Sequence, residues 1–358
     1  MDVLRPPVVW IDGRCYRKYP VTGSNQKEQC YRSEENSHQS QNVVWTEESF
    51  DVDVPIEETD DGQFKATLAI PSVFFKVIIG TKGLTKKRLE NETTTKIIVP
   101  KQGMEGDIII YGPQKCGVIS ARTRMELLVD SARKKTPFTH FLSLPLNQGP
   151  IQNGFLDFRD DVLRQCDGMR GIDASIFQNP QKLHLTIGTL VLLDKQERKL
   201  AGEILKQCEK EVVEPCLEGQ PLDVTVEGIE YMNDDPAEVD VLYAQIQTTN
   251  HSNRLQRLAN SLVDKYTSSG LMNKQFDSVK LHLTLMNTKF RTDISGESQN
   301  SPQRRRKPRE TFDASYILQT FKNYHFGHTT ISEVHLSQLH ATDKDGYYAC
   351  SAKLELPK

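Results

Sequence analysis

The sequence predicts an α+β protein with two folded regions, and three observations indicate this fold class. The chain has 358 residues, which is more than one small core requires. Residues 51–135 show apolar patterns in the order β-α-α-β-β-α. In residues 136–358 a strand–helix–strand pattern occurs twice, and each copy ends in nearly the same six residues. This repetition indicates an internal duplication, so we expect the second region to be bilobal.

The composition excludes several broad classes. Charged residues make up 26% of the chain and the net charge is −3, so nucleic-acid binding must rely on local basic patches. The seven cysteines include no Cys-x-x-Cys pair, which indicates neither a zinc site nor a disulfide framework and favours a reducing compartment. No apolar run of about 18 residues and no signal-peptide core occurs, so we expect neither a membrane span nor secretion.

Residues 1–50 are predicted to form a partner-docking segment followed by a disordered linker. Residues 21–49 are rich in Ser, Asn, Gln and Glu, a composition typical of disorder. Residues 8–20 are instead aromatic, β-branched and basic. Such a segment either docks on a partner protein or adds a strand to one of this chain's own sheets, and the sequence leaves both readings open.

The elements of residues 51–135 follow from apolar periodicity and turn residues. We expect a strand at 63–70, a short helix from Pro71, a second helix at 84–94, strands at 97–100 and 107–111, and a long helix at 114–133.

A glycine-rich loop lies between the first two of these helices. It reads Gly80-Thr81-Lys82-Gly83, and Lys86 and Lys87 follow within the next turn. Glycines without a Cβ let backbone amides and a helix N-terminus approach phosphates closely, and the lysines add positive charge. The plain alternative is a simple helix–helix turn. We predict binding of RNA, with single-stranded DNA as a second ligand, through backbone and shape more than through base sequence.

The loop and its surroundings resemble the type I KH domain. The resemblance rests on residues 79–83, on the basic turn at 86–88 and on Thr-x-x-x-Ile-x-Val-Pro around residues 94–100. It implies that the loop clamps the backbone of about four nucleotides.

The second region, residues 136–358, contains further alternating and helical patterns. Strands are expected at 138–146, 182–193, 222–231, 239–246, 280–285, 331–336 and 347–356, and helices at 151–166, 194–213, 253–268 and 316–322. A basic loop at 291–311 interrupts this region. Its run at 304–309, Arg-Arg-Arg-Lys-Pro-Arg, is a nuclear-import signal, an RNA patch or merely a solvated loop.

The two nearly identical stretches are residues 182–187, Lys-Leu-His-Leu-Thr-Ile, and residues 280–285, Lys-Leu-His-Leu-Thr-Leu. Strand alternation places the leucines on one face and His184 with Thr186, or His282 with Thr284, on the other. A single histidine on an apolar strand is usually a core residue. Repetition of the polar face is hard to explain by packing, so we expect the two lobes to bring both pairs together across a cleft.

Two such pairs suit general acid–base catalysis at a phosphodiester. One neutral imidazole takes a proton, a protonated one donates to the leaving oxygen, and Thr186 and Thr284 donate hydrogen bonds to phosphate oxygens. The motifs lack the carboxylates of two-metal sites, so we predict no metal and no cofactor.

Other polar and aromatic residues near the motifs have both a functional and a plainer interpretation. Lys182 and Lys280 share the histidine face by parity and are candidates for the rim, although exposed lysine is the common case. Phe177 and Phe290 flank the strands, and either stack on a base or pack in the core. His140, His335 and His340 are expected in the core. The pair His325 and His328 lacks a third metal ligand, so it does not indicate a metal site.

The duplicated His-x-Thr resembles the 2H phosphoesterase superfamily, which includes LigT-type and AKAP-seven-like proteins, over residues 137–358. The resemblance implies a metal-independent phosphodiesterase acting on RNA phosphodiesters or cyclic phosphate ends. The alternative is a catalytically weak RNA-binding adaptor that holds a phosphate end.

The order of the regions, together with residues 11–20, 136–141, 175–180 and 228–236, resembles a family of subunits of nuclear transcription-coactivator complexes. This resemblance implies a helicase and other subunits as partners, docked through residues 8–20. It also implies a nuclear location with the cytoplasm as a second compartment, and roles in transcription and alkylation-damage repair.

Overall fold

The computed structural model describes residues 8–11, 14–17, 56–101, 104, 106–248, 252–274, 276–291 and 309–358. Residues 55–358 form one compact unit, and residues 1–54 form another. The linker at 21–49 and most of the basic run, residues 304–308, lie outside the described residues. Within the described part, no helix is both long and apolar enough to span a membrane.

The N-terminal segment contains a hairpin. β1 (Val8–Ile11) pairs antiparallel with β2 (Arg14–Arg17), and this two-stranded sheet has no further strand. The reading in which residues 8–20 add a strand to a larger sheet of the same chain therefore does not describe these two strands.

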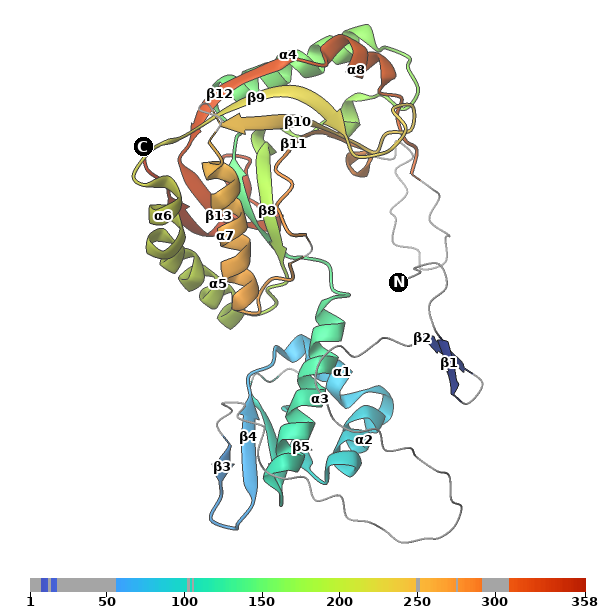
Figure 1. Ribbon diagram of the computed structural model, residues 1–358, viewed down its shortest axis with the longest axis vertical. Helices are drawn as coiled ribbons and strands as arrows, with labels where there is room; N and C mark the ends of the chain where they lie inside the picture. Colours follow the sequence, from blue (N-terminus) through green and yellow to red (C-terminus); the bar gives the residue numbers. More distant parts are fainter. Residues whose placement is uncertain are drawn as a thin grey trace. The chain divides into compact units, whose positions relative to one another are not determined.

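The next elements reproduce the predicted β-α-α-β-β-α order (Figure 1). A short β3 (Glu57–Glu58) precedes this order, and the four strands form one antiparallel sheet in the order β3-β4-β6-β5. The core between sheet and helices contains Ile78, Ile97, Ile108, Ile110 and Met125, each fully buried. The elements are β4 (Phe64–Leu68), α1 (Phe75–Ile79), α2 (Leu84–Thr93), β5 (Lys96–Ile98), β6 (Ile108–Gly112) and α3 (Lys115–Arg133).

The remaining chain builds one eight-stranded sheet in the order β12-β9-β10-β11-β8-β7-β13-β14. Its strands are β7 (His140–Pro145), β8 (His184–Leu190), β9 (Leu222–Tyr231), β10 (Val241–Thr248), β11 (Leu283–Asn287), β12 (His325–Ile331), β13 (Glu333–Thr342) and β14 (Tyr348–Glu355). The duplication is visible as β7-α4-β8 and β10-α7-β11, and the two halves of the sheet meet where β8 pairs with β11.

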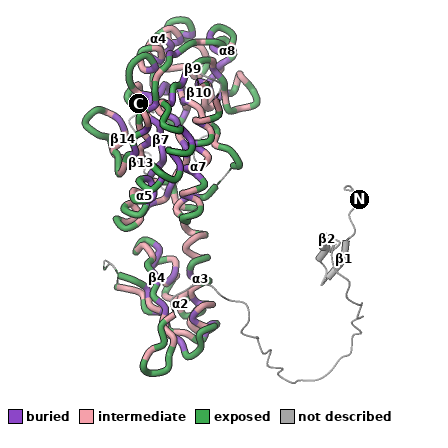
Figure 2. Tube along the Cα trace, turned by 60° about the vertical axis from the view of Figure 1, so that its left-hand side comes forward, coloured by how far each residue is buried: buried purple, intermediate pink, exposed green. Residues whose placement is uncertain are grey.

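Helices cover this sheet across the two halves. α4 (Gly149–Gln165) contacts β12 in the opposite half, whereas α7 (Arg254–Ser268) contacts β8 and α5 (Lys195–Cys208) contacts β14. Each half therefore receives a helix that follows a strand of the other half, and all of them share one apolar core. Buried positions follow strands such as β7 and β13, whereas loops and outer helix faces are exposed (Figure 2).

The structure differs from the sequence-based expectation in several places. β12 was missed, because its glycine and polar residues break the apolar alternation that marks a strand. The helix predicted at 194–213 continues through a π-helical turn, Glu209–Val213, into α6 (Glu214–Leu217). The first histidine strand ends at Leu190, three residues before the predicted end.

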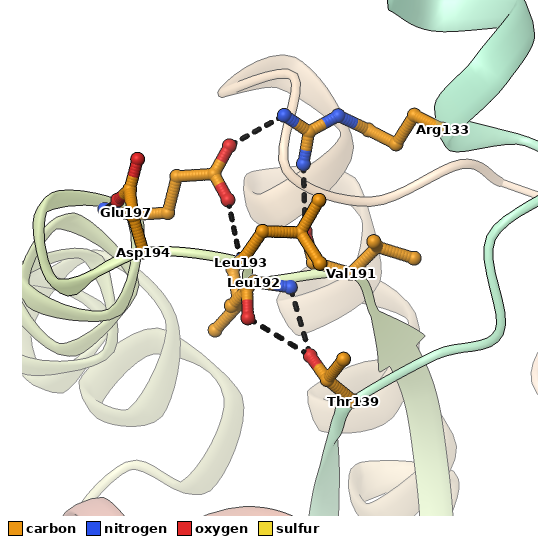
Figure 3. Close-up of polar contacts among 7 residues, drawn as sticks. All are labelled: Arg133, Thr139, Val191, Leu192, Leu193, Asp194 and Glu197. Carbon is orange, nitrogen blue, oxygen red and sulfur yellow. Dashed lines mark hydrogen bonds and ion pairs between the residues drawn. The ribbon is translucent and has the colours of Figure 1, made fainter. Parts of the chain in front are cut away.

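One side chain of α3 joins the KH-like domain to the eight-stranded domain. Arg133 Nη1 donates to the carbonyl of Val191 at 2.6 Å, and Nη2 donates to the carboxylate of Glu197 in α5 (Figure 3). The guanidinium also lies over the Phe74 ring, 5.2 Å from its centroid. The other carboxylate oxygen of Glu197 accepts the Leu193 amide at 2.8 Å, so this contact ties the end of α3 to the start of α5.

Candidate active site

The two histidine motifs lie on neighbouring antiparallel strands. Leu185 of β8 stands opposite Leu283 of β11, and both side chains are fully buried. Alternation then turns the polar residues of both motifs to the other face of the same sheet. The antiparallel register places His184 beside Thr284, and Thr186 beside His282. We call these four residues the two-histidine face.

This arrangement brings together all four predicted catalytic side chains, in a geometry that the sequence did not predict. The expectation was two strands facing each other across a cleft between lobes. The strands are instead adjacent, so each imidazole neighbours the hydroxyl of the other motif, at the distance typical of directly opposed residues in a sheet. One phosphate group can therefore contact residues of both motifs.

Each imidazole is oriented by a backbone carbonyl. His184 Nδ1 lies 2.7 Å from the carbonyl oxygen of Lys182, and His282 Nδ1 lies 2.8 Å from that of Lys280. A carbonyl only accepts hydrogen bonds, so Nδ1 carries the proton in both rings. Nε2 is then the nitrogen that can take up or deliver a proton. The same hydrogen bond occurs in both motifs because each lysine stands two residues before its histidine in the sequence.

Aromatic rings flank both histidines, and sequence reasoning missed them. Phe141 of β7 and Tyr348 of β14 lie 5.1 and 5.4 Å from the His184 ring, between centroids. Tyr243 of β10 lies 5.2 Å from the His282 ring. These residues come from strands far away in the sequence, so no local pattern could have identified them.

Burial lowers the pKa of both imidazoles and so favours their neutral forms. Burial lowers the pKa of His184 to about 4, against the hydrogen bond to the carbonyl of Lys182, and the nearby His282 adds to the lowering. Burial also lowers the pKa of His282, against the bond to the Lys280 carbonyl and together with the Lys280 ammonium group. We had expected one protonated imidazole near neutral pH. A bound phosphate anion would raise both pKa values, because it favours the charged form.

The four candidate rim residues have different surroundings. Lys182 Nζ donates to Thr342 Oγ1 at 3.1 Å and lies over the Tyr348 ring, 4.8 Å from its centroid. It therefore contacts the same tyrosine that flanks His184. Lys280 is exposed, and Phe290 is half-buried in a short 3₁₀ helix after β11. Phe177 is 6% exposed and belongs to the apolar core, which is the packing alternative that the sequence left open.

The other histidines considered above divide between buried and exposed positions. His140 is buried, and its Nδ1 lies 2.8 Å from Thr139 Oγ1. His335 Nε2 lies 2.6 Å from the carboxylate of Glu333. The expectation for His340 was wrong, because it lies near the end of β13 and is exposed. His325 is exposed and lies 3.4 Å from the carboxylate of Glu227.

The glycine-rich loop has the backbone that close approach to a ligand requires. Gly80 has a φ of 70°, and a Cβ there would lie 2.1 Å from Thr85 Oγ1. Lys82 (φ 52°) and Gly83 (φ 76°) also occupy the left-handed region, and α2 then begins at Leu84. The side chains of Thr81 and Lys82 are exposed, as is that of Lys87, whereas Lys86 lies 3.7 Å from the carboxylate of Glu90. The amides at the start of α2 and the loop lysine thus indicate an anion-binding surface.

This fold and site define a KH domain joined to a duplicated two-histidine phosphoesterase domain. Residues 65–126 match the family described as "KH domain", and residues 138–356 match "AKAP7 2'5' RNA ligase-like domain". The chain belongs to this AKAP7 2'5' RNA ligase-like family and carries a KH domain before the family's domain. It is an RNA-binding, phosphoesterase-like protein.

One relative matches this chain over nearly the whole length of both proteins. "Activating signal cointegrator 1 complex subunit 1" of Mus musculus is 45% identical over 354 residues, which cover 98% of each chain. Among solved structures, E. coli LigT complexed with NADP+ is 16% identical and covers 62% of this chain and 100% of its own, with a TM-score of 0.36. The first KH type I domain of human Vigilin is 27% identical, covers 28% and 94%, and has a TM-score of 0.20.

Proposed function

We propose that the chain is a metal-independent RNA phosphodiesterase whose KH domain binds the substrate RNA. The observation that supports this most is the two-histidine face, with both Nδ1 atoms held by backbone carbonyls. Both Nε2 atoms are then free of the proton that Nδ1 carries, and we propose that they act on one phosphorus. One imidazole removes a proton from the attacking water or 2′-hydroxyl, the other protonates the leaving oxygen, and Thr186 and Thr284 bind the non-bridging oxygens.

The test is product analysis with labelled RNA that ends in a 2′,3′-cyclic phosphate, or that contains a 2′-5′ linkage. We expect turnover to continue in excess EDTA, because proton transfer by two histidines needs no metal. A second function, that of an adaptor that holds a phosphate end, is supported by the lowered pKa of both imidazoles, which disfavours a protonated imidazole in the free site. RNA binding without any product after long incubation would favour the adaptor.

RNA binding is expected to depend on the charge of the Gly-x-x-Gly loop. Lys82→Asp should weaken binding of single-stranded RNA about tenfold at low salt and reduce the salt slope of log K by about one. Asp tolerates the left-handed φ of this position, so the loop should keep its shape. Lys199→Asp makes the same charge change on an 80% exposed side chain of α5 and should leave affinity unchanged. Equal losses in both variants would argue against the loop as the clamp.

We further propose that the protein acts in the nucleus as a subunit of an activating signal cointegrator complex, with a helicase among its partners. The name of the Mus musculus relative supports membership of such a complex. Roles in transcription and alkylation-damage repair are part of the same proposal. Residues 8–20 are the proposed docking segment, although the side chains of this segment lie outside the described residues. Capture of partner subunits should fall when Trp10 and Tyr16 are replaced by Ala, and undiminished capture would contradict this role.

A further inference from the structure

The two imidazoles have equivalent backbone hydrogen bonds but different aromatic neighbours. His184 lies beside Tyr348, with an interplanar angle of 84°, and His282 lies beside Tyr243 at 64°. A tyrosine ring attracts cations through its negative face, so each tyrosine can influence the protonation of its histidine. The other charged group that each tyrosine contacts therefore decides whether the tyrosine favours or opposes protonation of its histidine.

At His184 the tyrosine already binds a cation. The Lys182 ammonium lies 4.8 Å from the Tyr348 centroid, and its hydrogen bond to Thr342 Oγ1 fixes it there. The Tyr348 ring thus binds Lys182, and the same ring lies 5.4 Å from the His184 ring between centroids. Phe141, the other flanking ring, carries no charge. This environment disfavours a second positive charge on His184.

At His282 the tyrosine binds an anion. Tyr243 Oη donates to Glu230 Oε2 at 2.8 Å, and Gln245 Nε2 donates to Glu230 Oε1 at 2.5 Å. Burial, followed by this hydrogen bond and the Glu230 charge, raises the pKa of Tyr243 to about 12, so the phenol remains protonated. A phenol that donates to a carboxylate has a more electron-rich ring, which favours a cation beside it.

Few other charged groups adjoin the two imidazoles. Lys280, two residues before His282, opposes protonation of His282, and a charged His282 opposes protonation of His184. The cross-strand neighbours Thr186 and Thr284 are neutral. The carboxylate of Glu230, which acts through Tyr243, is the negative group that distinguishes the second motif from the first.

We propose that Tyr243 and Glu230 are positioning residues that make His282 the general acid and leave His184 as the general base. This assignment rests on the proposed phosphodiesterase function. His184 Nε2 takes a proton from the attacking oxygen as that oxygen bonds to phosphorus. The bond from phosphorus to the leaving oxygen breaks, and His282 Nε2 gives its proton to that oxygen. His184 thus gains one proton and His282 loses one. Proton exchange with water then restores the neutral His184 and the protonated His282.

The pH dependence of kcat/KM tests this polarity. The rate should rise with pH as His184 loses its proton, and fall as His282 loses its own. Glu230→Gln removes negative charge, which lowers the pKa of His282, so the descending limb should move about half a unit toward lower pH while the ascending limb stays. Tyr243→Phe should do the same. Lys182→Met should raise the pKa of His184 and move only the ascending limb, toward higher pH.

A matched variant and a direct titration complete the test. Glu227→Gln, on the same strand β9 and paired with His325, should move neither limb. Proton–carbon NMR of the imidazoles, with and without inorganic phosphate, should show His282 titrating at higher pH than His184 and moving down in Glu230→Gln. That order without any turnover would reject the proposed function and keep the electrostatic assignment. The reverse order, or an unmoved His282 midpoint in Glu230→Gln, would overturn the assignment even in an active enzyme.

Discussion

Replacing His184 or His282 with Asn is expected to lower kcat on an RNA phosphodiester about 10²- to 10⁴-fold each, the usual contribution of a general acid or base. Asn keeps an N–H group that can donate to the carbonyl of Lys182 or Lys280, so the strand ends should stay in place. The kcat of the double variant should be only slightly lower than that of the less active single variant, because the two imidazoles act in one proton-transfer sequence.

The measurement is single-turnover kinetics together with RNA affinity and thermal unfolding. Affinity and unfolding temperature should remain near the wild-type values, since the KH loop and the leucine faces of β8 and β11 are untouched. His340→Ala removes an exposed histidine of β13 and should leave the rate unchanged. A double variant as active as the wild type would exclude catalysis by this face. Thr186→Ala and Thr284→Ala should cost less, as each removes one donor to the phosphate.

Replacing Arg133 with Ala is expected to lower the free energy of unfolding by about 3 kcal/mol. The side chains of Arg133 and Glu197 are only 16% and 13% exposed, so the change leaves a largely buried carboxylate without its partner (Figure 3). The carbonyl of Val191 loses its donor, and the Phe74 ring loses the guanidinium above it. Thermal unfolding should show a drop of several degrees.

A double-mutant cycle separates this contact from general damage. Arg133→Ala combined with Glu197→Ala should cost less than the sum of the single changes, by about 1–3 kcal/mol. The matched control is Arg164→Ala, whose ion pair with Asp161 is 74% and 35% exposed, and which should cost under about 0.5 kcal/mol. Additive losses would mean that the two side chains do not stabilise each other across the domains.

Much of the site was predictable because it depends on local spacing. Alternation along a strand predicted that His184 and Thr186 share a face, and buried Leu183 and Leu185 confirm it. The Gly-x-x-Gly loop between two helices was predicted in the same way, from residue types that permit a left-handed backbone. The KH and 2H resemblances, and the α+β fold class with them, are confirmed by the family matches.

Other features could not be read from spacing. β12 escaped prediction because the partner strand β9, and not an apolar alternation, stabilises it. Phe177 looked equally suited to a base or to the core until the fold placed it opposite Met286 at an isolated bridge. The tyrosines beside the histidines and the contact of Arg133 with Glu197 join segments that are distant in sequence.

By itself, the sequence determined which side chains are candidates for the chemistry and which face of its own strand each one occupies, because alternation is a property of a single strand. Only the tertiary structure decided that Leu185 stands opposite Leu283, and therefore that each histidine lies beside the other motif's threonine. Strand register depends on the burial of the whole apolar set at once. The tertiary structure also decided that the Lys182 ammonium lies over the Tyr348 ring and that the Tyr243 hydroxyl donates to Glu230, and our proposed assignment of base and acid rests on this difference.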